Sequence, residues 1–171
     1  FITTESGSLS KIHGSKKHRE AGSLILLEPQ GSLGYDGALT HVKGRGNSTF
    51  VLNKKPYQIK LDKATDIAGM GRARTWVLLA NYRDNSLLRT SVALSLAQAA
   101  GLAYTSRFQQ VDLYINNDYY GAYLLCEKVE VGGSRVDIDD LEKATQGVNE
   151  KPLEEYKRFG SNAYSPGKSK G

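Results

Sequence analysis

Along most of the chain, apolar residues fall into short runs separated by turn-forming segments, and these runs have the length and spacing of β-strands. One run alternates regularly: Tyr57, Ile59 and Leu61 share a face, which predicts a half-buried strand. Another run, residues 76–80, is apolar throughout, which predicts burial on both sides. The strands expected in the first half of the chain are residues 23–28, 38–43 and 56–62, whereas the secondary structure of residues 76–80 is left open.

Residues 86–100 have the strongest helical signal. Asp84, Asn85 and Ser86 offer N-cap side chains, and Gly101 stands where a helix should end. Apolar residues inside the segment recur at helical spacing, so we expect the helix to pack one face against a sheet. These apolar positions are Leu87, Leu88, Val92, Leu96 and Ala99.

A hairpin is expected near the end of the patterned region. Residues 111–115 alternate as in a half-buried strand, and residues 119–127 are expected as a second strand paired back on them. Asn116, Asn117 and Asp118 between the two have a composition typical of a tight turn. Strands, then one helix, then a hairpin predict an α+β fold, in which an antiparallel sheet carries one main packed helix.

Length and composition indicate one globular domain. The chain has 171 residues, enough for a single substantial core, and no apolar run approaches the length of a membrane span. Cys126 is the single cysteine, so an internal disulfide and a cysteine-based zinc site are excluded. It lies in an apolar run, which favours a buried thiol.

The charge is moderately positive, with a net value of +5 and an isoelectric point near 9.2. This surplus permits contact with phosphates or anionic surfaces. No recognised nucleic-acid motif accompanies it, so we do not expect nucleic acid as a partner. The positive residues gather in residues 11–19, expected as a surface loop, and in residues 43–63.

Three segments carry candidate chemistry. Residues 44–49, Gly-Arg-Gly-Asn-Ser-Thr, place Arg45 between glycines, where its guanidinium could fork onto phosphate oxygens. A tight turn explains the glycines equally well. Lys60 lies on the alternating strand nearby, where a lysine either holds phosphates or faces solvent. Arg83 and Arg89 flank the predicted helix start and fit either structural braces or an anion site.

Together and in order, these segments resemble the CotH kinases, a family of atypical protein kinases named after a bacterial spore-coat protein. The similarity covers about residues 35–140, the N-terminal part of such a domain. The matching blocks are residues 43–50, 54–62, 69–71, 76–81, 84–89, 111–116, 120–128 and 135–138.

The resemblance implies a sheet like that of a protein-kinase N-lobe, an atypical kinase fold. It also implies binding of ATP with Mg²⁺ and transfer of phosphate to Ser or Thr of a protein substrate, such as a coat or surface protein. An extracellular, cell-surface or spore-coat location is implied as well. The nucleotide-binding residues expected by this resemblance are Arg45, Asn47, Lys55, Lys60 and Glu127. Those expected to brace the neighbouring loop are Asn81, Asp84 and Arg89.

The family pattern continues into an acidic, metal-binding second half, which residues 139–171 do not resemble. Asp137 and Asp139 are the candidate metal ligands here, although capping of a helix that starts near Asp139 is the simpler explanation. We therefore expect residues 1–141 to form the N-terminal, nucleotide-binding part of the domain. Residues 142–171 are either weakly structured or the start of the second half.

An alternative function requires no catalysis. The same fold could serve as a surface-binding or adhesion module, with the basic segment 11–19 and the ten tyrosines contacting a partner.

Overall fold

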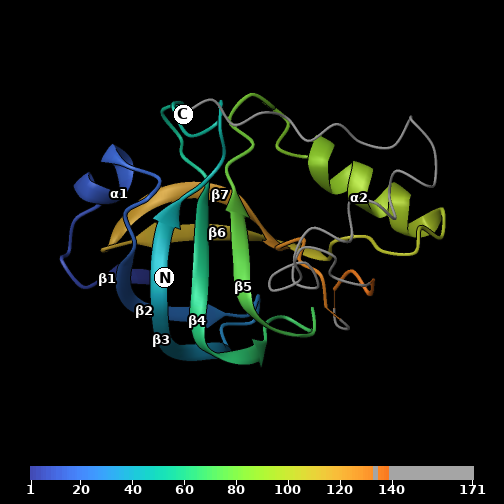
Figure 1. Ribbon diagram of the computed structural model, residues 1–171, viewed down its shortest axis with the longest axis horizontal. Helices are drawn as coiled ribbons and strands as arrows, with labels where there is room; N and C mark the ends of the chain where they lie inside the picture. Colours follow the sequence, from blue (N-terminus) through green and yellow to red (C-terminus); the bar gives the residue numbers. More distant parts are fainter. Residues whose placement is uncertain (133–134, 139–171) are drawn as a thin grey trace, which may run out of the picture.

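The main feature of the computed structural model, which describes residues 1–132 and 135–138, is a closed barrel of seven strands (Figure 1). The strand order around the barrel is β1-β2-β3-β4-β5-β7-β6. Neighbouring strands are antiparallel except β1 and β6, which are parallel. The elements are β1 (Ile2–Thr4), α1 (Ser10–Gly14), β2 (Glu20–Leu27), β3 (Leu33–Gly44), β4 (Tyr57–Asp66), β5 (Arg72–Leu79), α2 (Arg89–Ala99), β6 (Phe108–Ile115) and β7 (Asp118–Glu127).

The interior of the barrel is the hydrophobic core. The alternation in β4 predicted its buried face correctly, since Tyr57, Ile59 and Leu61 are at most 1% exposed. Across the β4–β5 ladder, Tyr57 lies opposite Leu78 and Ile59 opposite Trp76, both buried as well. Because the sheet closes on itself, the inner faces of the strands cover one another.

The predicted hairpin is confirmed as β6 and β7, which pair from Phe108↔Cys126 to Ile115↔Asp118. Asn116 and Asn117 form its turn with φ of 52° and 72°. Both values lie in the left-handed region, which asparagine tolerates better than most residues, so the turn composition determines the position of the hairpin.

The expectations of an α+β fold with a packed helix and of a sheet like that of a protein-kinase N-lobe are both wrong, because the described strands close into a seven-stranded barrel. The helix forms as α2, but Leu88, Val92 and Leu96, which were expected to pack, are 52%, 60% and 68% exposed. A different side chain, Leu94, packs against a small cluster that contains Cys126 on the outer face of β5 and β7. Figure 1 shows α2 to one side of the barrel. The strands already fill the barrel core with their own side chains, so α2 does not cover it.

Residues 11–19, expected as a surface loop, begin within α1, whose Ile12 is fully buried. From the same helix, His13 places Nε2 at 2.8 Å from the hydroxyl of Tyr57. Lys16 and Lys17 are exposed, as expected. In the part of the chain that the structure describes, no helix is long and apolar enough to cross a membrane.

Candidate functional site

A cavity of about 420 Å³ lies where the loop between β3 and β4, the end of β5 and the start of α2 come together. We call it the Arg45 cavity. Four cationic side chains and one carboxylate are among the groups that line it: Arg45, Lys54, Arg83, Arg89 and Asp84. The excess of positive charge makes it suitable for an anion.

Gly44 and Gly46 are required for the conformation of the β3–β4 loop itself. A Cβ on Gly44 would lie 2.1 Å from the ring of Phe50, and one on Gly46 would lie 2.1 Å from Oγ1 of Thr49. Gly46 also has a φ of 86°, a value that other residues rarely adopt. The turn explanation of the glycine motif therefore suffices for both positions.

Two lysines hold this loop in place. The ammonium of Lys54 donates to the carbonyl of Ala122 at 2.5 Å and lies 4.5 Å from the ring centre of Tyr123. The ammonium of Lys55 donates to the carbonyls of Phe50 and Leu52, at 2.8 and 3.2 Å. Lys55, predicted to bind nucleotide, thus has its donors directed to the loop backbone.

Arg83 is exposed and, within the described residues, also keeps its side-chain donors available, but the partly buried cation with available donors in this cavity is Arg45. Its side chain is half-buried and, within the described residues, takes part in no hydrogen bond or ion pair. Burial lowers the pKa of its guanidinium, because the charged form loses hydration. An anion that entered the cavity would replace the lost hydration, and a planar guanidinium can bind two oxygens at once.

The predicted braces lie together at the start of α2. Asp84 accepts hydrogen bonds from the hydroxyl of Ser86 at 2.7 Å and from the backbone N–H of Arg89 at 2.8 Å. These hydrogen bonds, that of Ser86 first, lower the pKa of Asp84. Asn81, with a φ of 47°, accepts from the hydroxyl of Thr90 at 3.2 Å. The backbone N–H of Asp84 donates to the carbonyl of Asn81 at 2.9 Å, so the three predicted braces form one bonded group that shapes a wall of the cavity.

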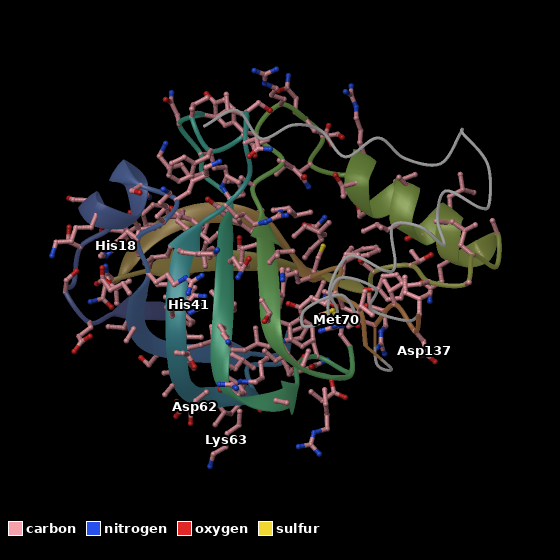
Figure 2. All side chains as sticks on the ribbon, in the orientation of Figure 1. His18, His41, Asp62, Lys63, Met70 and Asp137 are labelled. Atoms are coloured by element: carbon pink, nitrogen blue, oxygen red, sulfur yellow. The ribbon has the colours of Figure 1, made fainter. Side chains whose placement is uncertain are left out.

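Lys60 does not line the Arg45 cavity. It lies on the outer face of β4, opposite His41 of β3 and Thr75 of β5. His41, labelled in Figure 2, is 8% exposed, and its Nε2 has no hydrogen-bond partner. Burial and the charges of Arg19, Lys43 and Lys60 lower its pKa.

Lys43 lies on β3 opposite Gln58 of β4, beside the His41–Lys60 pair and two positions before Arg45. Its pKa is lowered by burial and then by the charges of Arg19, Lys128 and Arg45. Arg45 and Lys60 therefore both belong to a cationic strip on the outside of the barrel, although the structure does not bring them together in one cavity. Asn47 is exposed beside this region and accepts a hydrogen bond from Lys16 at 3.0 Å.

Glu127 lies in a buried ionic cluster. Its Oε1 accepts from Nη2 of Arg107 at 3.0 Å and from Nη1 of Arg135, and its Oε2 accepts from the backbone N–H of Arg107 at 2.9 Å. Arg135 also stacks over the ring of Trp76, with 4.7 Å to the ring centre. Neither Glu127 nor Asp84 pairs with Lys60: Glu127 pairs with Arg107 and Arg135, and Asp84 pairs with Arg89.

The metal prediction rests on few described atoms. Asp137 is exposed, and Asp139 lies outside the described residues. Over residues 1–132 and 135–138, no group of three or more His, Cys, Asp or Glu side chains could hold a metal ion. No Mg²⁺ ligand is therefore assigned.

Sequence reasoning singled out Arg83 and Arg89 but missed Arg107. Arg83 and Arg89 stand in a polar segment next to a buried one, a local signal that is visible in the sequence. Arg107 and Glu127 are 20 positions apart and meet only because β6 and β7 pair. No local pattern indicates that contact.

The comparison with family models supplies the identification. The model described as CotH kinase protein matches residues 42–162, well over half of the chain. The chain belongs to the CotH kinase protein family. The matched region includes the loop of Arg45, the strand of Lys60 and the start of α2. No curated protein sequence matches the chain. Membership in the CotH family associates it with a kinase-like or spore-coat-related function.

Proposed function

We propose that this chain is the nucleotide-binding part of an ATP-dependent protein serine/threonine kinase of the CotH family, and that the Arg45 cavity receives the triphosphate. Family membership supports the reaction class. The observation that carries the site is the half-buried guanidinium of Arg45, which lines a cavity of about 420 Å³ and has no partner in the described part of the chain.

The surrounding residues hold the walls of the cavity in place. Lys54 ties the β3–β4 loop to the backbone of β7, and Asp84 ties the start of α2 to the segment that follows β5. A site whose walls are already ordered loses less entropy when its ligand binds. Arg83 and Arg89 are exposed at the rim of the cavity, where solvent screens their charges. We therefore propose that they attract the anion to the cavity but contribute little to its affinity.

The cofactors ATP and Mg²⁺ remain part of the proposal. Phosphoryl transfer depends on positioning and on charge held by a metal. The described residues offer no ligand set for Mg²⁺, so no catalytic step is assigned to them. The protein substrate, a coat or surface protein, is proposed from the family alone.

Titration calorimetry with Mg²⁺–ATP tests the site. In Arg45→Gln we expect affinity to fall by about tenfold or more, because one hydrogen bond to a charged group contributes roughly 1.5–3 kcal/mol. Lys63→Gln is the matched control: Lys63 is an exposed lysine of β4 and lies at the other end of the barrel from the β3–β4 loop (Figure 2). Its affinity should equal that of the native chain.

Two further measurements locate the ligand. Inorganic triphosphate should compete with ATP and adenosine should not, because the assigned contacts are made to phosphate. The Lys60→Gln variant distinguishes ATP binding in the Arg45 cavity from ATP binding at the cationic strip on the outside of the barrel. If Arg45→Gln binds ATP like the native chain while Lys60→Gln does not, the Arg45 cavity is the wrong site. If saturating ATP leaves the melting temperature unchanged, the nucleotide proposal fails.

The second candidate function is a non-catalytic binding module on the same fold. It is favoured by the exposed apolar side chains of Leu88, the N-cap of α2, and of Val92 and Leu96 within α2, which recur at four-residue spacing. Loss of partner capture in Val92→Ser, in a chain that does not respond to ATP, would support this function.

A further inference from the structure

Four basic side chains meet on the outer face of the barrel, where β2, β3 and β4 lie side by side. His41 of β3 lies opposite Lys60 of β4, and Lys43 follows two positions later on the same face of β3. Arg19 directly precedes β2, which pairs with this part of β3. We call Arg19, His41, Lys43 and Lys60 the His41 cluster. Strand pairing thus gathers on one surface basic groups that are far apart in the sequence.

A β-bulge places His41 on this surface. Leu39 of β3 lies opposite Leu61 of β4, and the next pair joins His41 to Lys60. Two steps along β3 therefore correspond to one step along β4, and Thr40 is the extra residue. In a regular strand Leu39 and His41 would share a face, whereas here Leu39 lies in the core and His41 points outward. Bulges redirect side chains in this way and are common beside functional sites.

The positive charges of the cluster have no carboxylate to compensate them in the described part of the chain. The side chains of Arg19, Lys43 and Lys60 belong to none of its ion pairs. The charged groups that act on His41 are all cations, as are those that act on Lys43. Asp62 is exposed and also points outward from β4, but Figure 2 shows it nearer one end of the barrel than His41.

The ring of His41 has a nitrogen that lacks a partner. The side chain is 8% exposed, and among the described residues its Nε2 makes no hydrogen bond. Buried polar atoms in proteins nearly always have a partner, so the unpaired Nε2 indicates a group that is supplied from outside. Burial first, and then the charges of Arg19, Lys43 and Lys60, lower the pKa of His41. An anion beside the ring would offset the repulsion from these cations.

We propose that the His41 cluster binds the phosphate group of a phosphorylated serine or threonine in a protein segment. Such a group carries roughly 1.5–2 negative charges and three strong acceptor oxygens. These oxygens can accept from the fork of Arg19, from the ammonium groups of Lys43 and Lys60, and from Nε2 of His41. A carboxylate has one charge and two oxygens, so it would leave more of the positive charge uncompensated.

The position of the cluster fits a phosphate that remains attached to a polypeptide. Arg19 is exposed, and Lys43 and Lys60 are partly exposed, so the site is open to the surface. The charge of Arg45 also acts on Lys43, so the positive surface continues toward the Arg45 cavity. The choice of a phosphoprotein rests on the proposed kinase function, because that reaction makes phosphoserine and phosphothreonine, whereas the phosphate site itself does not rest on it. A substrate with several acceptor residues would be retained here between successive transfers.

An NMR titration of the full chain with the peptide acetyl-Gly-phosphoserine-Gly-amide tests this inference. Bound phosphate favours the charged imidazole, so the ring C–H signal of His41 should titrate at a higher pH when the peptide is present. The signal of His13, whose Nε2 lies 2.8 Å from the hydroxyl of Tyr57, should not respond. The unphosphorylated peptide should leave both signals unchanged.

Two lysines of the same strand provide the variant and its control. Lys60→Gln should weaken binding of the phosphopeptide by about tenfold or more, because it removes a donor to a charged group. Lys63→Gln, at an exposed lysine of β4, should bind the phosphopeptide like the native chain. Equal affinities of Lys60→Gln and the native chain would overturn the proposal.

Further outcomes separate this site from the nucleotide site. Arg45→Gln should weaken binding of ATP but change the affinity for the phosphopeptide by less than about threefold, because solvent and salt screen its charge at the cluster. If Mg²⁺–ATP displaces the phosphopeptide from His41, the cluster is part of the nucleotide site and the proposal is wrong. If inorganic phosphate shifts the His41 signal and the phosphopeptide does not, the cluster binds free anions only, which also refutes the proposal. Neither result bears on whether ATP binds in the Arg45 cavity of a chain that retains both sites.

Discussion

Replacement of Glu127 by glutamine should destabilise the fold strongly. The carboxylate is 2% exposed and accepts hydrogen bonds from Arg107 and Arg135. Glutamine has nearly the same shape, but its amide nitrogen cannot accept a hydrogen bond. The substitution therefore leaves arginine donors without an acceptor and removes the negative charge that compensates them.

The loss of stability depends on how far water can hydrate each arginine once the carboxylate is gone. The side chain of Arg135 is 4% exposed, so its charge would be left buried, whereas that of Arg107 is 44% exposed and water can hydrate it. Breaking a buried pair costs about 3–5 kcal/mol, and exposed pairs contribute at most about 1 kcal/mol. We therefore expect about 3 kcal/mol for Glu127→Gln, mostly through Arg135, and a smaller loss for Arg107→Gln.

Urea unfolding followed by circular dichroism measures this difference. The control is Glu130→Gln, because Glu130 also pairs with a cation, Lys128, at 2.6 Å, while the two side chains are 34% and 37% exposed. The control should lose less than about 1 kcal/mol. Equal losses in Glu127→Gln and Glu130→Gln would refute the conclusion that burial makes this cluster important.

Three further predictions concern the core, the thiol and the pH dependence. Ile59→Ala should lower the free energy of unfolding in urea by about 2–5 kcal/mol, because Ile59 is 1% exposed. Val92→Ala, on the exposed helix α2, should change it by less than about 0.5 kcal/mol. Similar losses in the two variants would contradict the conclusion that the barrel interior is the core. Burial raises the pKa of Cys126 to about 12. The thiol of the folded protein should therefore not react with a disulfide reagent at pH 8 until urea unfolds the chain. Rapid labelling of the folded protein would contradict this prediction. The pKa of His41 is lowered in the folded state, chiefly by burial, so the unfolded chain binds more protons near pH 6 and stability should fall as pH drops below the ordinary histidine pKa. His41→Gln should weaken this dependence between pH 7.5 and 5.5, leaving the part due to His13, and an unchanged dependence would refute the assignment.

Local patterns predicted the elements well where backbone preference and burial agree. The alternation of Tyr57, Ile59 and Leu61 corresponds to the inner face of β4, and Asn116 and Asn117 take the positive φ values that their turn requires. In the candidate site, the sequence indicated Arg45 and the group at the start of α2. It also placed Lys60 beside Arg45, whereas Lys60 lies on the outer face of β4 and does not line the cavity.

By itself, the sequence determined most of the strands, the helix, the hairpin and the membership in the CotH family, because each depends on residues that are near neighbours in the chain or on the order of motifs. The tertiary structure decided that the sheet closes into a barrel, that α2 leaves Val92 exposed, and that Glu127 meets Arg107 and Arg135. These features depend on which strands become neighbours. That choice is made by the packing of side chains far apart in sequence, which periodicity within a single segment does not record.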